Sequence, residues 1–168
     1  LLHDCAKCVP DEKKIAECRQ NDITITDSEY KSPYLLHSKL GAFYARTQYG
    51  INDTDILEAI TWHTTGHPDM TMLEKIVFVA DYIEPYRNKA ANLDKIRYLA
   101  FTNIDDAILH ILNDTINYLK ENDKPIDGIT LETYNFYKNY NKSNITIERN
   151  NKYHEKRSFK ADGKNYRR

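Results

Sequence analysis

The segment of residues 105–120 constrains the fold more than any other part of this chain. Its apolar side chains recur at intervals of three and four residues, the spacing that places them on one face of an α-helix. The members of this stripe are Ile108, Ile111, Leu112, Ile116 and Leu119. Such a stripe is typical of a helix that packs against other helices, so the segment predicts one helix of a helical domain.

Further helices are predicted by the same spacing together with capping and helix-breaking residues. Thr71 and Glu74 form a capping-box pattern, which opens a helix that ends before Pro85. Asp53 can cap a helix that ends near His63. Helices are also expected over residues 33–49, 96–101 and 130–140. No alternating strand series accompanies them, so the sequence predicts an all-α fold of roughly seven helices.

Length and charge indicate one domain followed by a basic tail. The chain has 168 residues, enough for one domain with its own core and too short for two. Residues 141–168 hold nine basic and three acidic residues, a net charge of +6, so the first 140 residues carry −7. We therefore predict a domain over residues 1–140 and a flexible, solvated tail over residues 141–168. Contact between this tail and RNA is the alternative.

Membrane and secreted classes are not favoured. No apolar run approaches the ~20 residues that a membrane-spanning helix needs, and no signal peptide precedes the first polar residues. The three cysteines are Cys5, Cys8 and Cys18. Cys5 and Cys8 have the spacing of a redox or zinc pair, but no second pair of ligands follows. Reduced thiols in a cytoplasmic protein are therefore expected.

Residues with metal-binding chemistry lie at two points of the chain. His3 and Asp4 are adjacent and follow two leucines, and both can reach one metal from a helix end. Asp81 lies within an apolar helix, where an unpaired carboxylate is costly and needs a cation or hydrogen-bond donors. A metal ion, or a salt bridge to Arg87 or Lys75, would meet that need. Imidazole and carboxylate groups together suit iron, manganese, zinc or magnesium.

Two further histidines have surroundings that favour function. His37 has Gly41 one turn later, which leaves room beside the imidazole for a ligand. His63 lies at a helix end before Thr64, where hydroxyls and free amides can hold phosphate oxygens. Structural histidines are the alternative for both. A metal held by such groups can lower the pKa of a bound water and neutralise a phosphate oxygen, so the pattern predicts hydrolysis of a phosphoanhydride or phosphodiester.

Four segments resemble the YqeK-type HD-domain proteins of bacteria. These are residues 1–4 (LLHD), 35–41 (LLHSKLG), 60–66 (ITWHTTG) and 73–87 (LEKIVFVADYIEPYR), and the match extends from Leu1 to about Tyr140. The members of this family are symmetrical bis(5'-nucleosyl)-tetraphosphatases, which use iron in an all-helical HD fold to split diadenosine tetraphosphate into two ADP. The resemblance implies this fold, this activity, a nucleotide substrate, a divalent metal and a homodimer. Iron is the metal it favours, although manganese and zinc accept the same ligands.

The resemblance also implies roles for individual residues. The implied catalytic residues and metal ligands are His3, Asp4 and Asp81. The implied substrate-binding residues are His37, His63, Thr64, Arg87, Lys124, Pro125, Ile126, Asp127, Gly128 and Ile129. His37 and His63 are also the implied ligands of a second metal. The family more often has His-Pro where this chain has Asp127 and Gly128, which is a departure within the nucleotide-contacting loop.

Another departure concerns the metal site. The family has a further histidine ligand upstream of the HD pair, and here only Leu1 and Leu2 precede His3. We therefore expect either a fragment of a longer protein or a site with one ligand fewer. The alternatives to a symmetrical tetraphosphatase are another HD phosphohydrolase that acts on nucleotides and an inactive nucleotide- or RNA-binding module.

Overall fold

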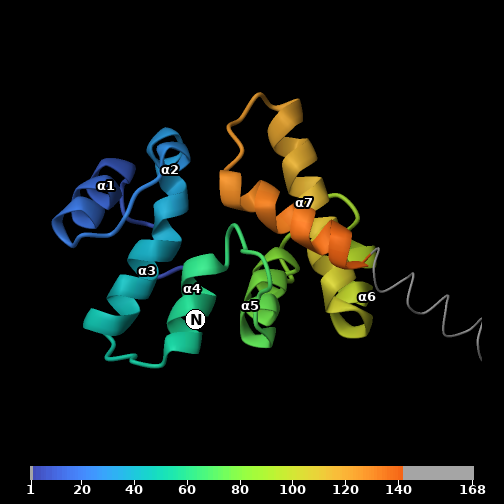
Figure 1. Cartoon of the computed structure of the whole chain (residues 1–168), viewed down its shortest axis with the longest axis horizontal. Helices are drawn as coiled ribbons and strands as arrows, with labels where there is room; N and C mark the ends of the chain where they lie inside the picture. The colour runs from blue at the N-terminus through green and yellow to red at the C-terminus, as the bar shows by residue number, and fades with distance from the viewer. Residues whose placement is uncertain (1, 142–168) are drawn as a thin grey trace, which may run out of the picture. The chain divides into compact units, whose positions relative to one another are not determined.

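Helices make up the regular structure of residues 2–141, the part of the chain that the computed structural model describes (Figure 1). Their order is α1 (Asp11–Gln20), α2 (Asp27–Lys31), the 3-10 helix η1 (Pro33–Leu35), α3 (Leu36–Thr47), α4 (Thr54–Trp62), α5 (Met72–Tyr82), α6 (Leu93–Thr102) and α7 (Ile104–Glu121). Residues 128–141 are helical as well. The all-α prediction is confirmed within this range, which contains no strand.

Two compact units divide the chain, residues 1–137 and residues 138–168. The first unit contains all the elements from α1 to α7. The predicted basic tail lies, apart from Asn141, outside the described residues. No helix in the described part is long and apolar enough to cross a membrane.

Capping residues start the helices where the sequence predicts. The Thr71 hydroxyl accepts a hydrogen bond from the Glu74 amide at 3.4 Å, and the Glu74 carboxylate accepts one from the Thr71 amide at 2.6 Å. This reciprocal pair satisfies two amides that α5 itself leaves free. The Asp53 carboxylate caps α4 in the same way, because it accepts from two amides of the first turn. After α3, Gly50 adopts a φ of +68°, a conformation that glycine adopts without strain.

Our sequence analysis missed α1 and α2. Thr26 and Glu29 form a second capping box at the start of α2, with hydrogen bonds of 3.2 and 2.8 Å. The pattern of residue types is the same as at Thr71. Helix α2 was not predicted because it has only five residues and carries no apolar stripe, which is the signal on which helix prediction mainly depends. The predicted helix over residues 33–49 is also divided, because Pro33 starts the 3-10 turn η1 before α3.

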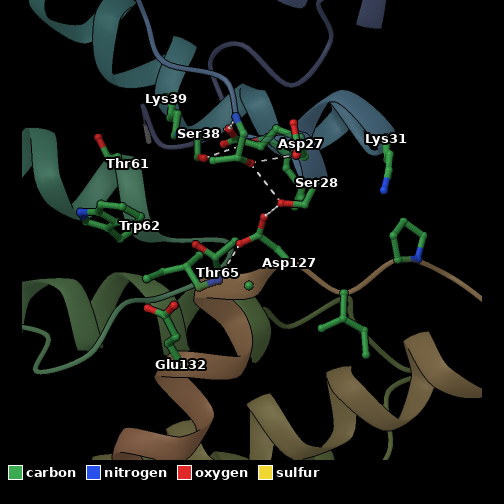
Figure 2. Close-up of a pocket in the computed structure, with 17 residues that line it drawn as sticks. Asp27, Ser28, Lys31, Ser38, Lys39, Thr61, Trp62, Thr65, Asp127 and Glu132 are labelled. Carbon is green, nitrogen blue, oxygen red and sulfur yellow. Dashed lines mark hydrogen bonds and ion pairs between the residues drawn. The ribbon is translucent and has the colours of Figure 1, made fainter.

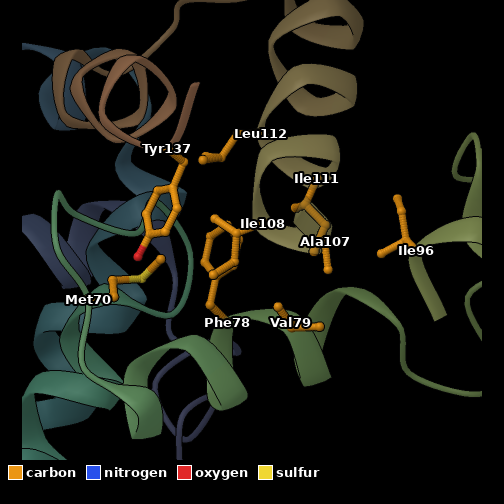
Figure 3. Close-up of a cluster of buried hydrophobic side chains, with 9 residues drawn as sticks. All are labelled: Met70, Phe78, Val79, Ile96, Ala107, Ile108, Ile111, Leu112 and Tyr137. Carbon is orange, nitrogen blue, oxygen red and sulfur yellow. The ribbon is translucent and has the colours of Figure 1, made fainter. Parts of the chain in front are cut away.

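The largest apolar core joins α5, α6, α7 and the last helix. Its buried members are Met70, Phe78, Val79, Ile96, Ala107, Ile108, Ile111, Leu112 and Tyr137. Figure 3 shows side chains of α5 and α7 meeting inside this cluster. The stripe predicted over residues 105–120 is therefore the face of α7 that is buried. A smaller cluster of Ala6, Cys18, Leu36 and Leu40 packs α1 and α3 against the turns that precede α1.

Contacts between successive helices bring distant residues together. Helix α3 packs on α4, and α4 packs on α5 (Figure 1). As a result, His37 in the first turn of α3 lies close to His63, the C-cap residue of α4. The end of α5, which carries Asp81, lies beside His3 and beside the end of α4.

Replacing Ile108 with alanine should lower the free energy of unfolding by about 2–5 kcal/mol, because the change leaves a cavity in the main core. Ile108 is 0% exposed. Denaturant titration followed by circular dichroism measures the loss. Ile76→Ala on α5 is the matched control, since Ile76 is 50% exposed, and its effect should stay within about 0.5 kcal/mol. Equal losses in the two variants would contradict this assignment of the core.

Candidate functional site

Five predicted site residues from separate elements form one polar cluster. They are His3, Asp4, His37, His63 and Asp81. The first two belong to the turns that precede α1, and the others to α3, the end of α4 and the last turn of α5. The His3 Nε2 atom lies 3.4 Å from Asp81 Oδ1 and 3.6 Å from Asp4 Oδ2. Asp4 Oδ1 lies 3.4 Å from His37 Nε2 and 3.5 Å from His63 Nε2.

Hydrogen bonds to main-chain carbonyls fix the tautomers of the two buried histidines. His37 Nδ1 lies 2.5 Å from the carbonyl oxygen of Tyr34, and His63 Nδ1 lies 2.7 Å from that of Ile60. Because a carbonyl oxygen can only accept, each ring donates through Nδ1. In the neutral imidazole, Nε2 then carries a lone pair. These two Nε2 atoms lie 3.1 Å apart and face the same point.

Burial keeps both imidazoles neutral. Desolvation lowers the pKa of His37 and of His63 below the ordinary histidine value of 6.5, although hydrogen bonds to carbonyls and nearby carboxylates partly oppose this shift. Asp4 is ionised: burial favours its neutral form, but the hydrogen bond from Lys7 and the nearby positive charges hold its pKa below 3.8. The cluster therefore combines a carboxylate with two neutral imidazoles.

This combination leaves too few hydrogen-bond donors for the acceptor atoms that face one another, which are Asp4 Oδ1 and the two Nε2 atoms. Asp4 Oδ1 is buried and has no hydrogen-bond donor. The hydroxyl of Thr64 lies 3.3 Å from His37 Nε2 and 3.2 Å from His63 Nε2, and it has one proton to donate. The two imidazole nitrogens thus share one donor, and Asp4 Oδ1 has none. A cation among them would remove this conflict, and imidazole nitrogens with a carboxylate oxygen are ligands that divalent transition metals prefer.

The geometry agrees with a metal site of this kind. One ligand atom each from His3, Asp4 and His63 lie within 4.8 Å of one another. Asp81 lies at the edge of this group and contacts it through His3. His37 and His63 are buried, whereas the side chains of Asp4 and Asp81 are 30% and 26% exposed. The cluster is therefore closed on the histidine side and open on the carboxylate side.

Of the two salt-bridge partners considered for Asp81, Lys75 and Arg87, only Arg87 lies beside it. Lys75 forms an ion pair with Asp105 at 2.8 Å and so serves another carboxylate. Arg87 lies beside Asp81, with Nη2 3.9 Å from the carboxylate and 3.3 Å from the main-chain carbonyl of the same residue. Its guanidinium also covers the ring of Tyr82 at 5.0 Å. Arg87 thus lies at the carboxylate edge of the cluster.

Our interpretation of Gly41 was wrong. We expected this glycine to leave room for a ligand beside His37. A Cβ atom at this position would instead meet the main-chain oxygen of His3 at 3.3 Å and Cys5 Sγ at 3.6 Å. The missing side chain therefore admits the segment that carries His3 and Asp4, so that α3 and this segment can approach closely.

The loop of residues 124–129 lies at another pocket. Residues 125–129 line a cavity of about 570 Å³ together with residues of α2, α3 and α4 (Figure 2). Asp127 is buried there: Oδ2 accepts a hydrogen bond from the Ser28 hydroxyl and Oδ1 accepts from the Ile129 amide at 2.9 Å. Both oxygens are therefore engaged within the protein. Lys124 is exposed and donates to the Tyr118 hydroxyl at 3.3 Å.

Two lysines near the cluster were not predicted. Lys7 donates to Asp4 Oδ2 at 2.7 Å. Lys14 has a buried side chain, pairs with Asp11 at 2.9 Å and lies close enough to His37 for its charge to lower that pKa. The sequence signal for Lys7 was its position one turn after Asp4. Lys14 gave no comparable signal, because its location depends on the packing of the unpredicted helix α1.

The cysteines form no thiol site. All three are free thiols. The group of side chains among residues 2–141 that could hold a metal ion contains none of them. Cys5 donates to the Gly41 carbonyl at 3.6 Å. Burial raises the pKa of Cys5, and it raises that of Cys18 to about 11. Such thiols are poor nucleophiles near neutral pH.

The lowered pKa values of His37 and His63 predict a pH dependence of stability in the metal-free protein. Below pH 6.5 the unfolded chain takes up protons at these residues that the folded chain does not, so the free energy of unfolding should fall as the pH drops below this value. Denaturant titrations between about pH 7.5 and 5 measure the slope. His63→Gln should flatten it, whereas His110→Gln, outside the cluster, should leave it unchanged. An equal slope in all three proteins would contradict the burial of uncharged imidazoles.

Comparison with known proteins identifies the fold. A family model described as "HD domain" matches residues 1–86. A solved structure of a predicted HD superfamily hydrolase involved in NAD metabolism, from Clostridium acetobutylicum, superimposes with a TM-score of 0.80 at 37% identity. The superposition covers 83% of this chain and 74% of the Clostridium acetobutylicum chain. The prediction of an HD-type helical domain is confirmed.

Relatives of known name are similar over most of this chain. The symmetrical bis(5'-nucleosyl)-tetraphosphatase of Halalkalibacterium halodurans is 41% identical over 80% of this chain and 71% of its own length. The protein of the same name from Bacillus subtilis is 37% identical over 81% of this chain and 72% of its own length. That from Staphylococcus aureus is 35% identical, over 86% and 74%. The chain therefore belongs to the HD-domain family, in the branch that includes the symmetrical bis(5'-nucleosyl)-tetraphosphatases.

Proposed function

We propose that this chain hydrolyses bis(5'-nucleosyl)-tetraphosphates symmetrically and splits diadenosine tetraphosphate into two ADP. The observation that carries the proposal is the cluster in which Asp4 Oδ1, without a donor, faces the Nε2 atoms of His37 and His63. The relatives named for this activity support the choice of substrate.

The residues of the cluster fit a divalent metal. His3, Asp4 and Asp81 are the proposed ligands, with His37 and His63 completing the buried side. Iron is the proposed metal, and manganese or zinc would accept the same donor atoms. A metal bound there would lower the pKa of a water and polarise a phosphate oxygen, which is the chemistry that hydrolysis of a phosphoanhydride needs.

The surrounding residues favour approach of a polyphosphate from the open side. The cavity beside His63 and Asp81 measures about 40 Å³, which has room for ordered water and none for a nucleotide. The phosphate chain would therefore lie over the exposed edge. Arg87 and Lys7 lie beside this edge and offer positive charge to a highly charged substrate. Thr64 offers a hydroxyl to a phosphate oxygen.

We propose that a nucleoside part of the substrate contacts the loop of residues 124–129. The adjoining cavity of about 570 Å³ has a volume typical of small-molecule sites. Lys124, Pro125, Ile126, Gly128 and Ile129 remain available for that contact. Asp127 is the exception, because its oxygens already bind Ser28 and the Ile129 amide, and its proposed role is to hold the loop in place.

A product assay tests the function directly. The protein, loaded with iron or manganese, is incubated with diadenosine tetraphosphate and the products are separated by ion-exchange chromatography. Symmetrical cleavage gives ADP alone, whereas asymmetrical cleavage gives ATP and AMP. Absence of ADP with either metal would overturn the proposal.

Asp81→Asn should greatly reduce the amount of metal bound per chain. The change keeps the shape of the side chain and removes the charge that a cation needs. Metal analysis after gel filtration measures the loss, and circular dichroism should show unchanged helicity. Asp55→Asn, at an exposed position of α4, is the control and should bind metal as the parent does. Full metal content in Asp81→Asn would exclude Asp81 as a ligand.

Arg87→Lys should raise KM for diadenosine tetraphosphate by about tenfold, because an ammonium cannot reproduce the two-pronged contact between a guanidinium and a phosphate. Initial rates over a range of substrate concentrations give the value. Arg46→Lys on the exposed end of α3 removes a guanidinium elsewhere and should behave as the parent. Unchanged kinetics in Arg87→Lys would rule out the phosphate role.

A further inference from the structure

Arg97 of α6 directs its guanidinium at the main chain of the turn that follows α5. Nε donates to the Ile83 carbonyl at 3.4 Å. Nη2 donates to the Glu84 carbonyl at 3.2 Å and to the Arg87 carbonyl at 3.1 Å. One side chain thus binds three carbonyls within five consecutive residues.

The start of this turn is also held by Ile83, which packs against the main core and donates from its amide to the Val79 carbonyl at 3.0 Å. Further along, the Arg87 amide donates to the Glu84 carbonyl at 3.1 Å, and the Tyr86 amide donates to the Glu84 carboxylate at 2.9 Å. The side chain of Tyr86 is 90% exposed and adds no packing. Arg97 therefore supplies the hydrogen bonds that join the later residues of the turn to α6.

The turn determines where the guanidinium of Arg87 lies. Arg87 ends the turn, and its side chain reaches back to Asp81 at the cluster. Its Nε atom is buried and has no hydrogen-bond partner, so the guanidinium is held through Nη2 and through the ring of Tyr82. A shift of the turn would therefore move the positive charge away from the open edge of the cluster.

The chemistry of Arg97 suits this task. The carbonyls that end a helix carry partial negative charge, and a cation there is favourable. A guanidinium offers several donors in a rigid plane, whereas a lysine ammonium offers a single charged point. The alternative partner on α6 is Asp94, which is fully exposed and lies 3.9 Å away, so it competes weakly.

We propose that Arg97 is a positioning residue for substrate binding, which holds the turn of residues 83–87 and thereby places Arg87 at the edge of the metal cluster. The inference rests on the proposed function, because it takes Arg87 as a phosphate-binding residue. Arg97 acts through Arg87 and does not itself touch the substrate.

A double-mutant cycle tests the proposal in the metal-loaded full chain. Arg97→Gln should lower kcat/KM for diadenosine tetraphosphate by about tenfold, since a well-aligned charged contact would be lost. In an Arg87→Ala background the same change should have almost no further effect, because residues that act through one another are not additive. Arg97→Lys should retain an intermediate kcat/KM. Arg46→Gln is the matched control for charge and should behave as the parent.

Hydrogen exchange and ADP binding separate this inference from the proposed function. Exchange at the Tyr86 and Arg87 amides should quicken in Arg97→Gln, while metal content stays unchanged. Calorimetry with ADP should show the same pattern of non-additive losses as the kinetics. A parent protein that releases no ADP would overturn the function alone. Additive losses in the two backgrounds, or parental affinity and exchange in Arg97→Gln, would overturn the role of Arg97. If Arg97→Gln does not fold, Arg97→Lys provides the same comparison.

Discussion

Asp4 Oδ1 lies opposite the unprotonated Nε2 atoms of His37 and His63, and the Thr64 hydroxyl has one proton to offer the two nitrogens. In a buried setting such facing lone pairs repel one another. The packing of α3 on α4 enforces the arrangement, since each imidazole is tied through Nδ1 to a carbonyl of its own helix. The fold therefore holds together a set of atoms that a bound cation would stabilise.

The charges around this cluster are local exceptions in an acidic domain. The first 140 residues carry a net charge of −7, which by itself would repel a polyphosphate. Lys7 and Arg87 lie near the opening of the cluster, beside Asp4 and Asp81, and supply positive charge there. The site has two unlike sides. Buried neutral imidazoles line one side, and partly exposed carboxylates and cations line the other. A phosphate chain can reach a metal from the solvent side, while the histidines remain shielded.

The sequence predicted those features that depend on local pattern. The stripe on α7, the cap at Thr71 and the cluster residues His3, His37, His63 and Asp81 follow from periodicity, capping chemistry and a resemblance to known segments. Features that depend on packing were not predictable in the same way. Lys14 approaches His37 only because α1 folds over the turns before it. The role of Arg97 depends on three main-chain carbonyls of another segment. Every residue has such a carbonyl, so the sequence does not show which of them an arginine will reach.

Gly41 shows how the same limit applies to interpretation. A glycine in the middle of a helix costs about 1 kcal/mol relative to alanine, so α3 would be more stable without it. Its Cβ position lies 3.3 Å from the main-chain oxygen of His3, too close for a methyl group unless the segment that carries His3 moves. The tolerance of position 41 to substitution is therefore set by His3 and Cys5, which belong to a different part of the chain. A residue that contributes no atom to the cluster thus limits how the segment that carries two of its members can pack.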